Sequence, residues 1–202
     1  MEFTFIADGI NAVVIDNFYT PEEYDLVLGE CISLLPQMKG ESQTAGALDA
    51  EGRVIKKNQG AFIKQTGSNI ETLSADKIFS PDVRDRMLLS NSLYKILFGL
   101  NQFSTLVSYY ADSDYYANHI DDSIFTVVVY VYKQPKKFSG GDIVLQSYID
   151  GTMATVESLS NRAIIFPSVT PHSVKPVHLS NDTGGDGRFC ITHFINYRNV
   201  RT

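Results

Sequence analysis

Hydrophobic and polar positions divide the chain into two unlike halves. After Asn101, short apolar runs rich in Val, Ile, Tyr and Phe alternate with turn residues. Seven such runs follow one another, at residues 103–110, 124–132, 141–148, 154–158, 162–167, 172–177 and 188–197. Closely spaced short strands are typical of antiparallel sheets, whereas parallel sheets need a helix between successive strands. The second half therefore predicts a double-sheet jelly roll or barrel.

The N-terminal half contains helical patterns instead. Residues 10–17 predict a short strand, and residues 18–35 predict a helix with Thr20 as N-cap and Pro21 at the first helical position. Residues 80–100 carry apolar side chains at helical spacing, which predicts one or two further helices.

These patterns together predict a mostly β, α+β fold in one domain that spans residues 1–202. We expect helical support over roughly residues 1–100 and a jelly-roll core over roughly residues 101–198. Residues 37–60 are polar with no sustained period until a strand at residues 58–64, so they predict a long loop or hairpin.

Composition narrows the class of protein. The chain has 202 residues, 44% of them apolar, and 23 Tyr and Phe without a Trp, which suits one β-rich globular domain. No apolar run has the length of a membrane span, and the N-terminus does not resemble a signal peptide, so we expect a cytoplasmic protein without a membrane partner. Cys31 and Cys190 are expected to be reduced and packed as small apolar groups.

The net charge of −6 argues against a nucleic-acid partner. The densest basic run, residues 133–137, is expected to be a solvated hairpin edge.

His119 and Asp121 are the first candidate for chemistry. They stand two apart in a run that otherwise reads as strand, where side chains two apart share a face. An imidazole and a carboxylate side by side can bind a divalent metal, and His172 would complete a facial triad with open positions. The alternatives are a solvated surface turn, and Asp122 in place of Asp121 if the strand ends early.

The last run places its side chains on two unlike faces. Arg188, Cys190, Thr192 and Asn196 alternate with the apolar residues Phe189, Ile191 and Ile195. We expect the first face to line a polar cavity and the second to pack against the helices.

An ordered set of motifs gives these residues a context: Tyr110 nine residues before His119, the segments FSGGDIVL, NRAIIFP and HSVKPV, and Arg188 opening RFCITHF. From about Phe103 to Tyr197 the chain resembles the iron(II)- and 2-oxoglutarate-dependent dioxygenases, in their prolyl-hydroxylase-like branch. The resemblance implies a double-stranded β-helix that uses Fe(II), 2-oxoglutarate and O2, with ascorbate as a further candidate.

The resemblance also implies roles for individual residues. His119, Asp121 and His172 would bind the metal and act catalytically through it, and Arg188 would bind the far carboxylate of 2-oxoglutarate with a planar fork. Tyr130 and Thr192 match residues that help to hold this carboxylate, and Tyr110 matches a tyrosine near the metal-chelating end. The alternatives are a surface salt bridge for Arg188 and ordinary core packing for both tyrosines.

The implied reaction is hydroxylation of an unactivated carbon with release of succinate and CO2. The branch favours a prolyl or other residue of a peptide or protein as substrate, and a free amino acid or other small metabolite is the alternative. In the family, segments such as residues 37–60 often fold over the site, so a lid and an uninvolved surface loop are both open. Rival functions are a cupin-like metal enzyme, a nucleic-acid demethylase and an inactive jelly-roll binding module.

The sequence departs from the family pattern in three respects. His172 and Arg188 lie 16 residues apart (188 − 172), and the excess falls in residues 178–187, whose Asn, Asp and Gly content predicts a hairpin loop. Phe194 stands where relatives often carry Trp, and Cys190 stands where many carry a smaller residue. His178 and His193 are expected to be structural or on the surface.

Overall fold

The structure, a computed structural model, describes residues 1–7, 9–44, 46, 48–64 and 66–198. It contains three α-helices, α1 (Pro21–Leu34), α2 (Asn69–Ile78) and α3 (Pro81–Ser90), and four short 3-10 helices, η1 (Leu35–Gln37), η2 (Glu41–Gln43), η3 (Ser92–Lys95) and η4 (Leu97–Gly99). The strands are β1 (Glu2–Ile6), β2 (Ala12–Asp16), β3 (Lys39–Gly40), β4 (Lys56–Lys57), β5 (Gln59–Phe62), β6 (Gln102–Tyr110), β7 (Tyr115–His119), β8 (Phe125–Val131), β9 (Ser139–Gly140), β10 (Ile143–Gln146), β11 (Met153–Val156), β12 (Arg162–Pro167), β13 (His172–Val174), β14 (Val177–His178) and β15 (Arg188–Asn196).

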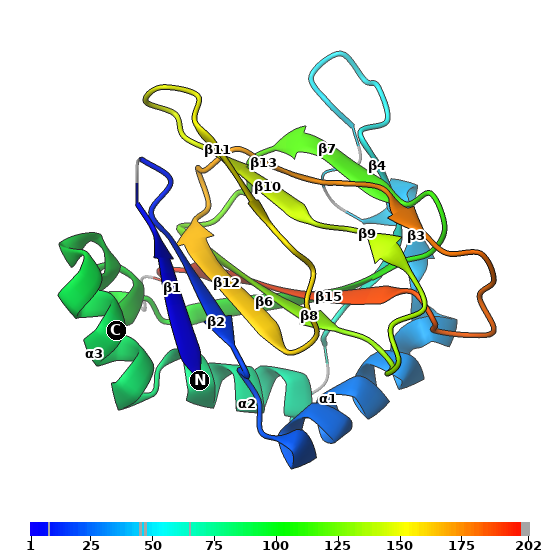
Figure 1. Cartoon of the computed structure of the whole chain (residues 1–202), viewed down its shortest axis with the longest axis horizontal. Coiled ribbons are helices and arrows are strands. Elements are labelled where there is room, and N and C mark those ends of the chain that lie inside the picture. Colours follow the sequence, from blue (N-terminus) through cyan, green and yellow to red (C-terminus); the bar gives the residue numbers. More distant parts are fainter. Residues whose placement is uncertain (8, 45, 47, 65, 199–202) are drawn as a thin grey trace.

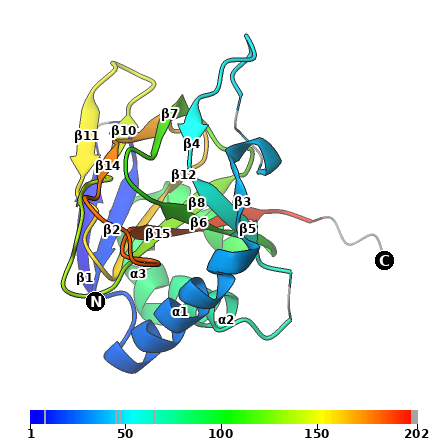
Figure 2. The same ribbon diagram turned by 90° about the vertical axis from the view of Figure 1, so that its right-hand side faces the viewer.

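Two antiparallel sheets face each other, and helices cover the outside of the larger one. The larger sheet has the strand order β1-β2-β12-β8-β15-β6-β5-β3, and the smaller has the order β11-β10-β13-β7-β4. Strands β14 and β9 pair with each other in a separate two-stranded sheet. In Figure 1 the helices lie below the larger sheet and the smaller sheet lies above it, and Figure 2 shows the same layers from the side. The predicted jelly roll with supporting helices is confirmed.

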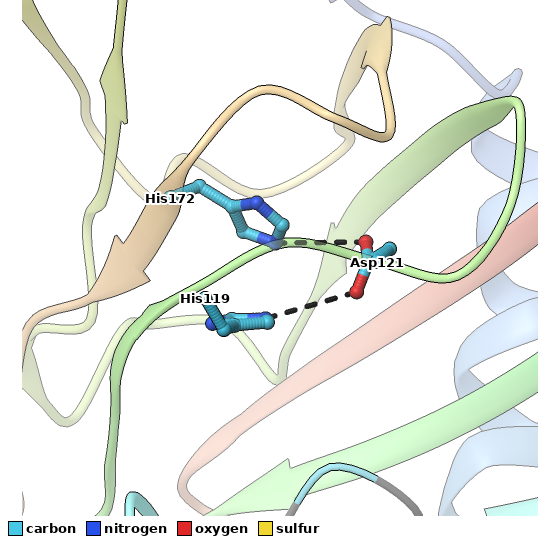
Figure 3. A group of neighbouring side chains, drawn as sticks. All are labelled: His119, Asp121 and His172. Carbon is cyan, nitrogen blue, oxygen red and sulfur yellow. Dashed lines mark ion pairs between the residues drawn. The ribbon is translucent and has the colours of Figure 1, made fainter. Parts of the chain in front are cut away.

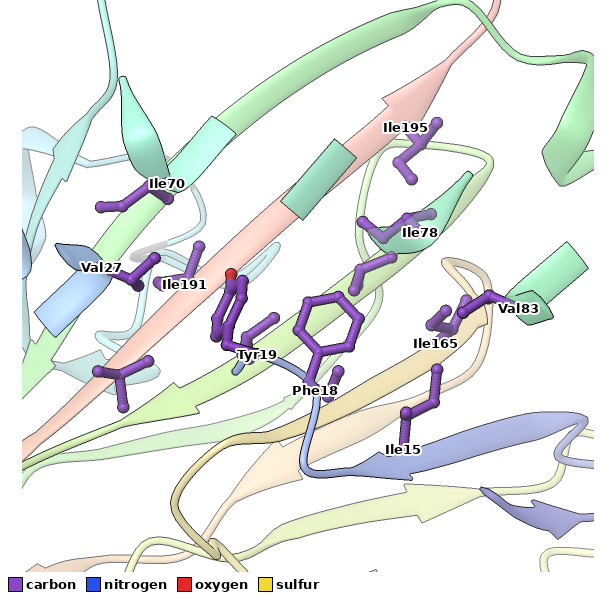
Figure 4. Packing of buried hydrophobic residues seen from close by; sticks show 14 of the residues in the cluster. Ile15, Phe18, Tyr19, Val27, Ile70, Ile78, Val83, Ile165, Ile191 and Ile195 are labelled. Atoms are coloured by element: carbon purple, nitrogen blue, oxygen red, sulfur yellow. The ribbon is translucent and has the colours of Figure 1, made fainter. Parts of the chain in front are cut away.

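Alternation along the central strands produces two separate cores. Val127, Val129 and Ile191 belong to a buried cluster under the helices, which Figure 4 shows around Ile191 and Ile165. Val128 and Tyr130 face the other way, into a cluster between the two sheets. The prediction that Phe189, Ile191 and Ile195 pack toward the helices is confirmed, since all three belong to the first cluster.

Helix α1 begins where the sequence predicts. The hydroxyl of Thr20 accepts a hydrogen bond from the Glu23 amide, and the Glu23 carboxylate accepts one from the Thr20 amide, which makes a complete capping box. Pro21 occupies the first turn, where its missing N–H costs nothing. The helix buries Val27 and Cys31 against the sheet, and Cys31 is a free thiol, as is Cys190.

Strand β1 and helix α2 were absent from the sequence prediction. Strand β1 lies at the edge of the larger sheet and has three exposed residues out of five, so it has no strong apolar pattern. Helix α2 is N-capped by Ser68, whose hydroxyl accepts from the Glu71 amide, and it buries only Ile70, Ser74 and Ile78. Short, polar elements of this kind depend on tertiary packing more than on local pattern.

The N-terminal half contributes more than helices. Strands β1, β2, β3 and β5 extend the larger sheet, and β4 extends the smaller one. Both sheets therefore combine segments from the two halves of the sequence. This continuity supports a single domain over residues 1–202, which stays a prediction.

Two predictions for the region before Arg188 were wrong. Residues 172–177 do not form one strand, because β13 ends at Val174 and β14 begins at Val177 in a different sheet. Residues 178–187 do not close a hairpin either, since β14 pairs with β9 whereas β15 pairs with β6 and β8. The inserted residues instead connect two sheets.

The insertion is anchored by charge. The carboxylate of Asp186 binds Lys133 Nζ at 3.4 Å and Lys137 Nζ at 3.1 Å. Asp186 also accepts hydrogen bonds from the hydroxyl and the amide of Thr183. These bonds, together with Lys137, lower the pKa of the Asp186 carboxyl well below its ordinary value. The basic run 133–137 thus holds this connection in place. The prediction that it lies at a hairpin edge was wrong, since β8 pairs with β12 and β15 whereas β9 pairs with β14.

The buried face of β15 predicts a large effect on stability. Replacement of Ile191 by Ala removes a fully buried side chain and should lower the free energy of unfolding by about 2 to 5 kcal/mol. The same substitution at Ile149, which is 83% exposed, should change it by no more than about 0.5 kcal/mol. Urea unfolding of both variants measures the difference, and equal effects would contradict the assignment of the core.

Candidate metal centre and charged cavity

A cavity of about 370 Å³ lies between the two sheets. Its floor is one face of β6, β8 and β15, and its opposite wall comes from β7, β10 and β13. The exposed lining residues Gly46, Phe62, Ile120 and Asp122 mark its mouth. The volume lies in the range of sites that bind small ligands.

The structure brings His119, Asp121 and His172 together in this cavity. Asp121 Oδ1 lies 3.7 Å from His119 Nε2, and Asp121 Oδ2 lies 3.6 Å from His172 Nε2. One ligand atom from each residue falls within 4.8 Å of the others, and Figure 3 shows both imidazoles directed at the carboxylate. Three donors at this separation can bind one metal ion, since ligands about 2.1 Å from a metal lie roughly 3 Å apart.

Backbone carbonyls define the tautomer of both histidines. His119 Nδ1 donates to the Ala117 carbonyl at 2.8 Å, and His172 Nδ1 donates to the Thr170 carbonyl at 3.0 Å. A carbonyl can only accept, so each Nδ1 carries the proton and each Nε2 presents its lone pair to the centre. Burial, with a smaller contribution from His172, also lowers the pKa of His119 to about 3, so this imidazole is neutral at physiological pH.

The prediction that His119 and Asp121 share one face of a strand was wrong. Strand β7 ends at His119, so Asp121 is not on a strand and the alternation rule does not place it. Its amide donates to the Ser168 carbonyl at 3.0 Å, and its Oδ2 accepts from the Thr126 hydroxyl at 2.7 Å. These two bonds turn the carboxylate toward the imidazoles.

The early end of the strand does not bring Asp122 into the group. Asp122 is exposed at the mouth of the cavity and lies outside the cluster of ligand atoms.

Arg188 is fully buried next to this cavity. Its guanidinium carbon lies 4.3 Å from the ring centre of Tyr110 and 4.8 Å from that of Tyr130. Within the described residues, no nitrogen of Arg188 has a hydrogen bond of good geometry to an acceptor, and the Tyr130 hydroxyl has none either, although this hydroxyl and the guanidinium lie close enough to interact. A buried cation stacked on aromatic rings but lacking an acceptor is costly, and an anionic ligand would offset the cost.

Gly141 has no side chain, and this leaves room for the side chain of Arg188. At φ +74° it has a backbone conformation that favours glycine, and a Cβ here would lie 3.2 Å from Arg188 Nε. Close packing against Arg188 therefore explains the second glycine of the FSGGDIVL segment.

The other predicted residues lie on the same face as Arg188. Thr192 is half-buried and lines the cavity, and its hydroxyl lies 3.7 Å from Cys190 Sγ. Tyr110 and Tyr130 also line the cavity. Tyr110 flanks Arg188 closely, and its role at the metal-chelating end stays a prediction. Phe194 and Asn196 continue the lining toward the mouth.

Residues 37–60 contribute to the cavity without forming one continuous loop. Strand β3 pairs with β5, β4 pairs with β7, and Leu48 bridges to Val54. Gly46, Lys56 and Asn58 line the cavity, so the segment does not lie apart from the site. Its action as a lid stays a prediction, and residues 45 and 47 lie outside the described part.

Sequence reasoning did not single out several residues of the site. Tyr116 stacks on His119, Lys56 is buried in the cavity wall, and Thr126 holds Asp121. None of these belongs to a motif, and only the predicted strand around Thr126 could have indicated a cavity residue.

The two groups that the resemblance implies fit these residues. Two imidazoles and one carboxylate are the donor set that non-haem iron(II) oxygenases use. The unpartnered guanidinium of Arg188 and the unpartnered hydroxyl of Tyr130 are suitable donors for a carboxylate. A dicarboxylic 2-oxo acid can therefore be accommodated with one end at Arg188.

Comparisons with known proteins agree with the fold. Residues 105–196 match the model of the 2OG-Fe(II) oxygenase superfamily. No curated protein matches the sequence significantly. Among the described residues, no helix is both long enough and apolar enough to cross a membrane.

Several solved structures with the same fold are described as prolyl hydroxylases. A Pseudomonas putida prolyl-4-hydroxylase is 18% identical with a TM-score of 0.63, and 94% of each chain is covered. A Trichoplax adhaerens prolyl hydroxylase, solved with a peptide fragment of the hypoxia inducible factor oxygen degradation domain, is 19% identical with a TM-score of 0.66 over 92% of this chain and 83% of that one. A viral collagen prolyl hydroxylase from Paramecium Bursaria Chlorella virus-1, in complex with 2OG, is 18% identical with a TM-score of 0.55, and the match covers 96% of this chain and 99% of that one.

The remaining histidines lie outside the cluster of ligand atoms. His178 is exposed. His193 is fully buried on the helix side of β15, where its Nδ1 lies 3.0 Å from the Thr105 hydroxyl. Burial lowers the pKa of His193 to about 3.

The buried His193 predicts a loss of stability in acid. The unfolded chain binds a proton below about pH 6.5, whereas the folded chain does not bind it until about pH 3. The stability linked to His193 is thus fully present above pH 6.5, and it falls by up to about 1.4 kcal/mol per pH unit as the pH drops through this window. Urea unfolding at several pH values should show a shallower decline for His193→Gln, and parallel curves would contradict the prediction.

Proposed function

We propose that the protein, whose residues 105–196 match the model of the 2OG-Fe(II) oxygenase superfamily, hydroxylates an unactivated carbon in a residue of a peptide or protein. A prolyl residue is the first candidate. The observation that carries this proposal is the combination, along one cavity, of a His-Asp-His group with a buried arginine that lacks an acceptor. The first can bind iron(II), and the second suits the far carboxylate of 2-oxoglutarate.

Iron would be held by His119 Nε2, His172 Nε2 and Asp121. Three protein ligands leave further coordination positions open for the 2-oxo acid and for dioxygen. When bound, iron(II), 2-oxoglutarate and O2 supply the oxidising equivalent for hydroxylation, with release of succinate and CO2. The chain's own part is orientation, because the Ala117 and Thr170 carbonyls and the Thr126 hydroxyl set the direction of the three ligands.

Arg188 would bind the far carboxylate with two parallel hydrogen bonds. The Tyr130 hydroxyl is available as a third donor, and Thr192 lies on the same face of β15. The rings of Tyr110 and Tyr130 flank the guanidinium and exclude water, which strengthens its interaction with an anion. The buried cation thus sets the depth at which the 2-oxo acid stops.

A peptide substrate is favoured over a small metabolite by two considerations. The solved structures of the same fold include prolyl hydroxylases, one of them bound to a peptide. The lining of the cavity also includes Phe62, Ser104, Phe194 and Asn196, of which Phe62 and Ser104 are exposed. An extended chain could enter along this open end, whereas a free amino acid would fill only part of it.

The rival functions explain fewer of these features. A cupin-like enzyme acting on a sugar, or an inactive binding module, has no use for an unpartnered buried arginine beside the metal ligands. The net charge of −6 still argues against a nucleic-acid substrate. A requirement for ascorbate and a cytoplasmic location stay predictions.

Succinate release tests the proposal directly. The purified protein is incubated with iron(II), 2-oxoglutarate and a library of proline-containing peptides and free metabolites. We expect iron-dependent succinate formation that is stimulated by peptides, with a mass gain of one oxygen in the substrate. Turnover stimulated only by free metabolites would transfer the proposal to the small-molecule alternative, and no iron-dependent turnover with any compound would contradict it.

Loss of one imidazole should remove the metal centre without unfolding the protein. His172→Ala should abolish iron-dependent turnover of 2-oxoglutarate, because two ligands bind iron(II) too weakly at working concentrations. Unfolding should remain cooperative, since the two hydrophobic clusters do not need the metal. His178→Ala, which alters an exposed histidine, is the control and should retain wild-type turnover. Wild-type turnover in His172→Ala would make the ligand assignment wrong.

Replacement of Arg188 should weaken the binding of the 2-oxo acid and leave metal binding unchanged. A buried carboxylate without its charged partner costs about 3 to 5 kcal/mol, so Arg188→Ala should raise the apparent 2-oxoglutarate constant by roughly two to three orders of magnitude. Arg188→Lys should recover only part, because a point charge replaces a planar fork.

Metal affinity should hardly change in either Arg188 variant, and Arg84→Ala, at an exposed arginine, should change neither constant. Equal loss of affinity for metal and 2-oxoglutarate would identify Arg188 as a structural residue instead.

A further inference from the structure

An extra residue in β7 places Tyr116 and His119 on one face. His119 pairs with His172, and Tyr116 pairs with Val174, so three steps along β7 correspond to two steps along β13. In a regular strand, residues three apart point to opposite faces. The register shift in β7, which has the form of a β-bulge, turns one side chain to the other face. As a result, the Tyr116 ring lies over the His119 imidazole.

The two rings are in close parallel contact. Their centres lie 3.5 Å apart and their planes differ by 14°. The hydrogen bond from His119 Nδ1 to the Ala117 carbonyl controls where the ring edge points. A bond in the ring plane does not by itself prevent the imidazole from tilting, whereas a flat ring stacked on its face does.

The Tyr116 hydroxyl also connects this stack to the mouth of the cavity. It donates to the Gly46 carbonyl at 2.7 Å. Gly46 has φ +76°, and a Cβ at this position would overlap the Tyr116 hydroxyl. Beyond Gly46, the chain returns through β4, where Lys56 pairs with Tyr116 in the ladder and its Nζ lies 5.3 Å from the tyrosine ring centre.

We propose that Tyr116 is a positioning residue for the metal centre. Its ring fixes the plane of His119, and its hydroxyl ties that ring to Gly46, so the backbone at the mouth of the cavity and the direction of one metal ligand are coupled. The proposal rests on the proposed metal centre. It adds a residue that no motif identifies, and it makes Gly46 part of the metal site.

Cobalt(II) binding tests the stacking without any turnover. Cobalt(II) is titrated into the metal-free protein, and both the affinity and the visible absorption spectrum, which reports ligand geometry, are recorded. Outer contacts that orient a ligand typically change metal affinity by about 10- to 100-fold. We expect a weakening of this order and an altered spectrum in Tyr116→Leu, and recovery to within about threefold of wild type in Tyr116→Phe, which keeps the ring.

Neighbouring positions provide matched controls. Tyr115→Leu changes the adjacent tyrosine of β7, which does not line the cavity, and should bind cobalt(II) as the wild type does. Gly46→Ala should perturb the spectrum because its Cβ displaces the tyrosine hydroxyl. Gly52→Ala introduces a similar backbone strain, at φ +78°, but has no atom within 4 Å of its Cβ, and should leave the spectrum unchanged.

Each outcome separates the steps of the proposal. A wild-type affinity and spectrum in Tyr116→Leu would overturn it. Equal effects of Gly46→Ala and Gly52→Ala would overturn the link to the mouth. His119→Ala is titrated in parallel: if it too binds cobalt(II) as wild type, the proposed metal centre itself is wrong, whereas loss of binding there with no effect of Tyr116→Leu refutes the role of Tyr116 alone.

Discussion

The arrangement of the site depends on a positive charge that is buried without a counter-charge. Arg188 is fully inaccessible to solvent, its guanidinium is flanked by two tyrosine rings, and its nitrogens have no acceptor among the described residues. Burial of an unpaired ion costs several kcal/mol, which the packing of the surrounding fold must offset. In the proposed function, a dicarboxylic ligand that enters the cavity would recover this cost, so the free energy stored at Arg188 would become affinity for the cosubstrate.

Strand alternation connects this cation to the metal centre. Residues 188, 190, 192, 194 and 196 of β15 face the space between the sheets, and their neighbours pack against the helices. The same face of β8 carries Tyr130, which pairs across from Cys190, and that of β6 carries Tyr110, which pairs with Arg188. The smaller sheet brings His172 opposite His119. The pairing of these strands therefore sets where the proposed anion site and the proposed metal site lie relative to each other.

Much of this could be predicted from the sequence, because the central strands alternate strictly and the site residues occur in a specific order. The prediction failed where tertiary structure overrides local pattern. Asp121 reaches the centre through bonds to Ser168 and Thr126, not through a strand face. Tyr116 was not found, because alternation directs it away from His119 and the irregularity in β7 reverses this. Strand β1 and helix α2 are too short and polar for a local signal.

The central claim is that one cavity holds a metal at His119, Asp121 and His172 and a 2-oxo acid anchored at Arg188. A crystal structure of the protein with manganese(II), which replaces iron(II) without oxidation, and 2-oxoglutarate tests it most directly. We predict one metal bound by these three side chains at roughly 2.0 to 2.2 Å, and a 2-oxo acid whose far carboxylate receives two hydrogen bonds from Arg188. A metal bound elsewhere, or a 2-oxo acid that leaves Arg188 without an acceptor, would contradict the account.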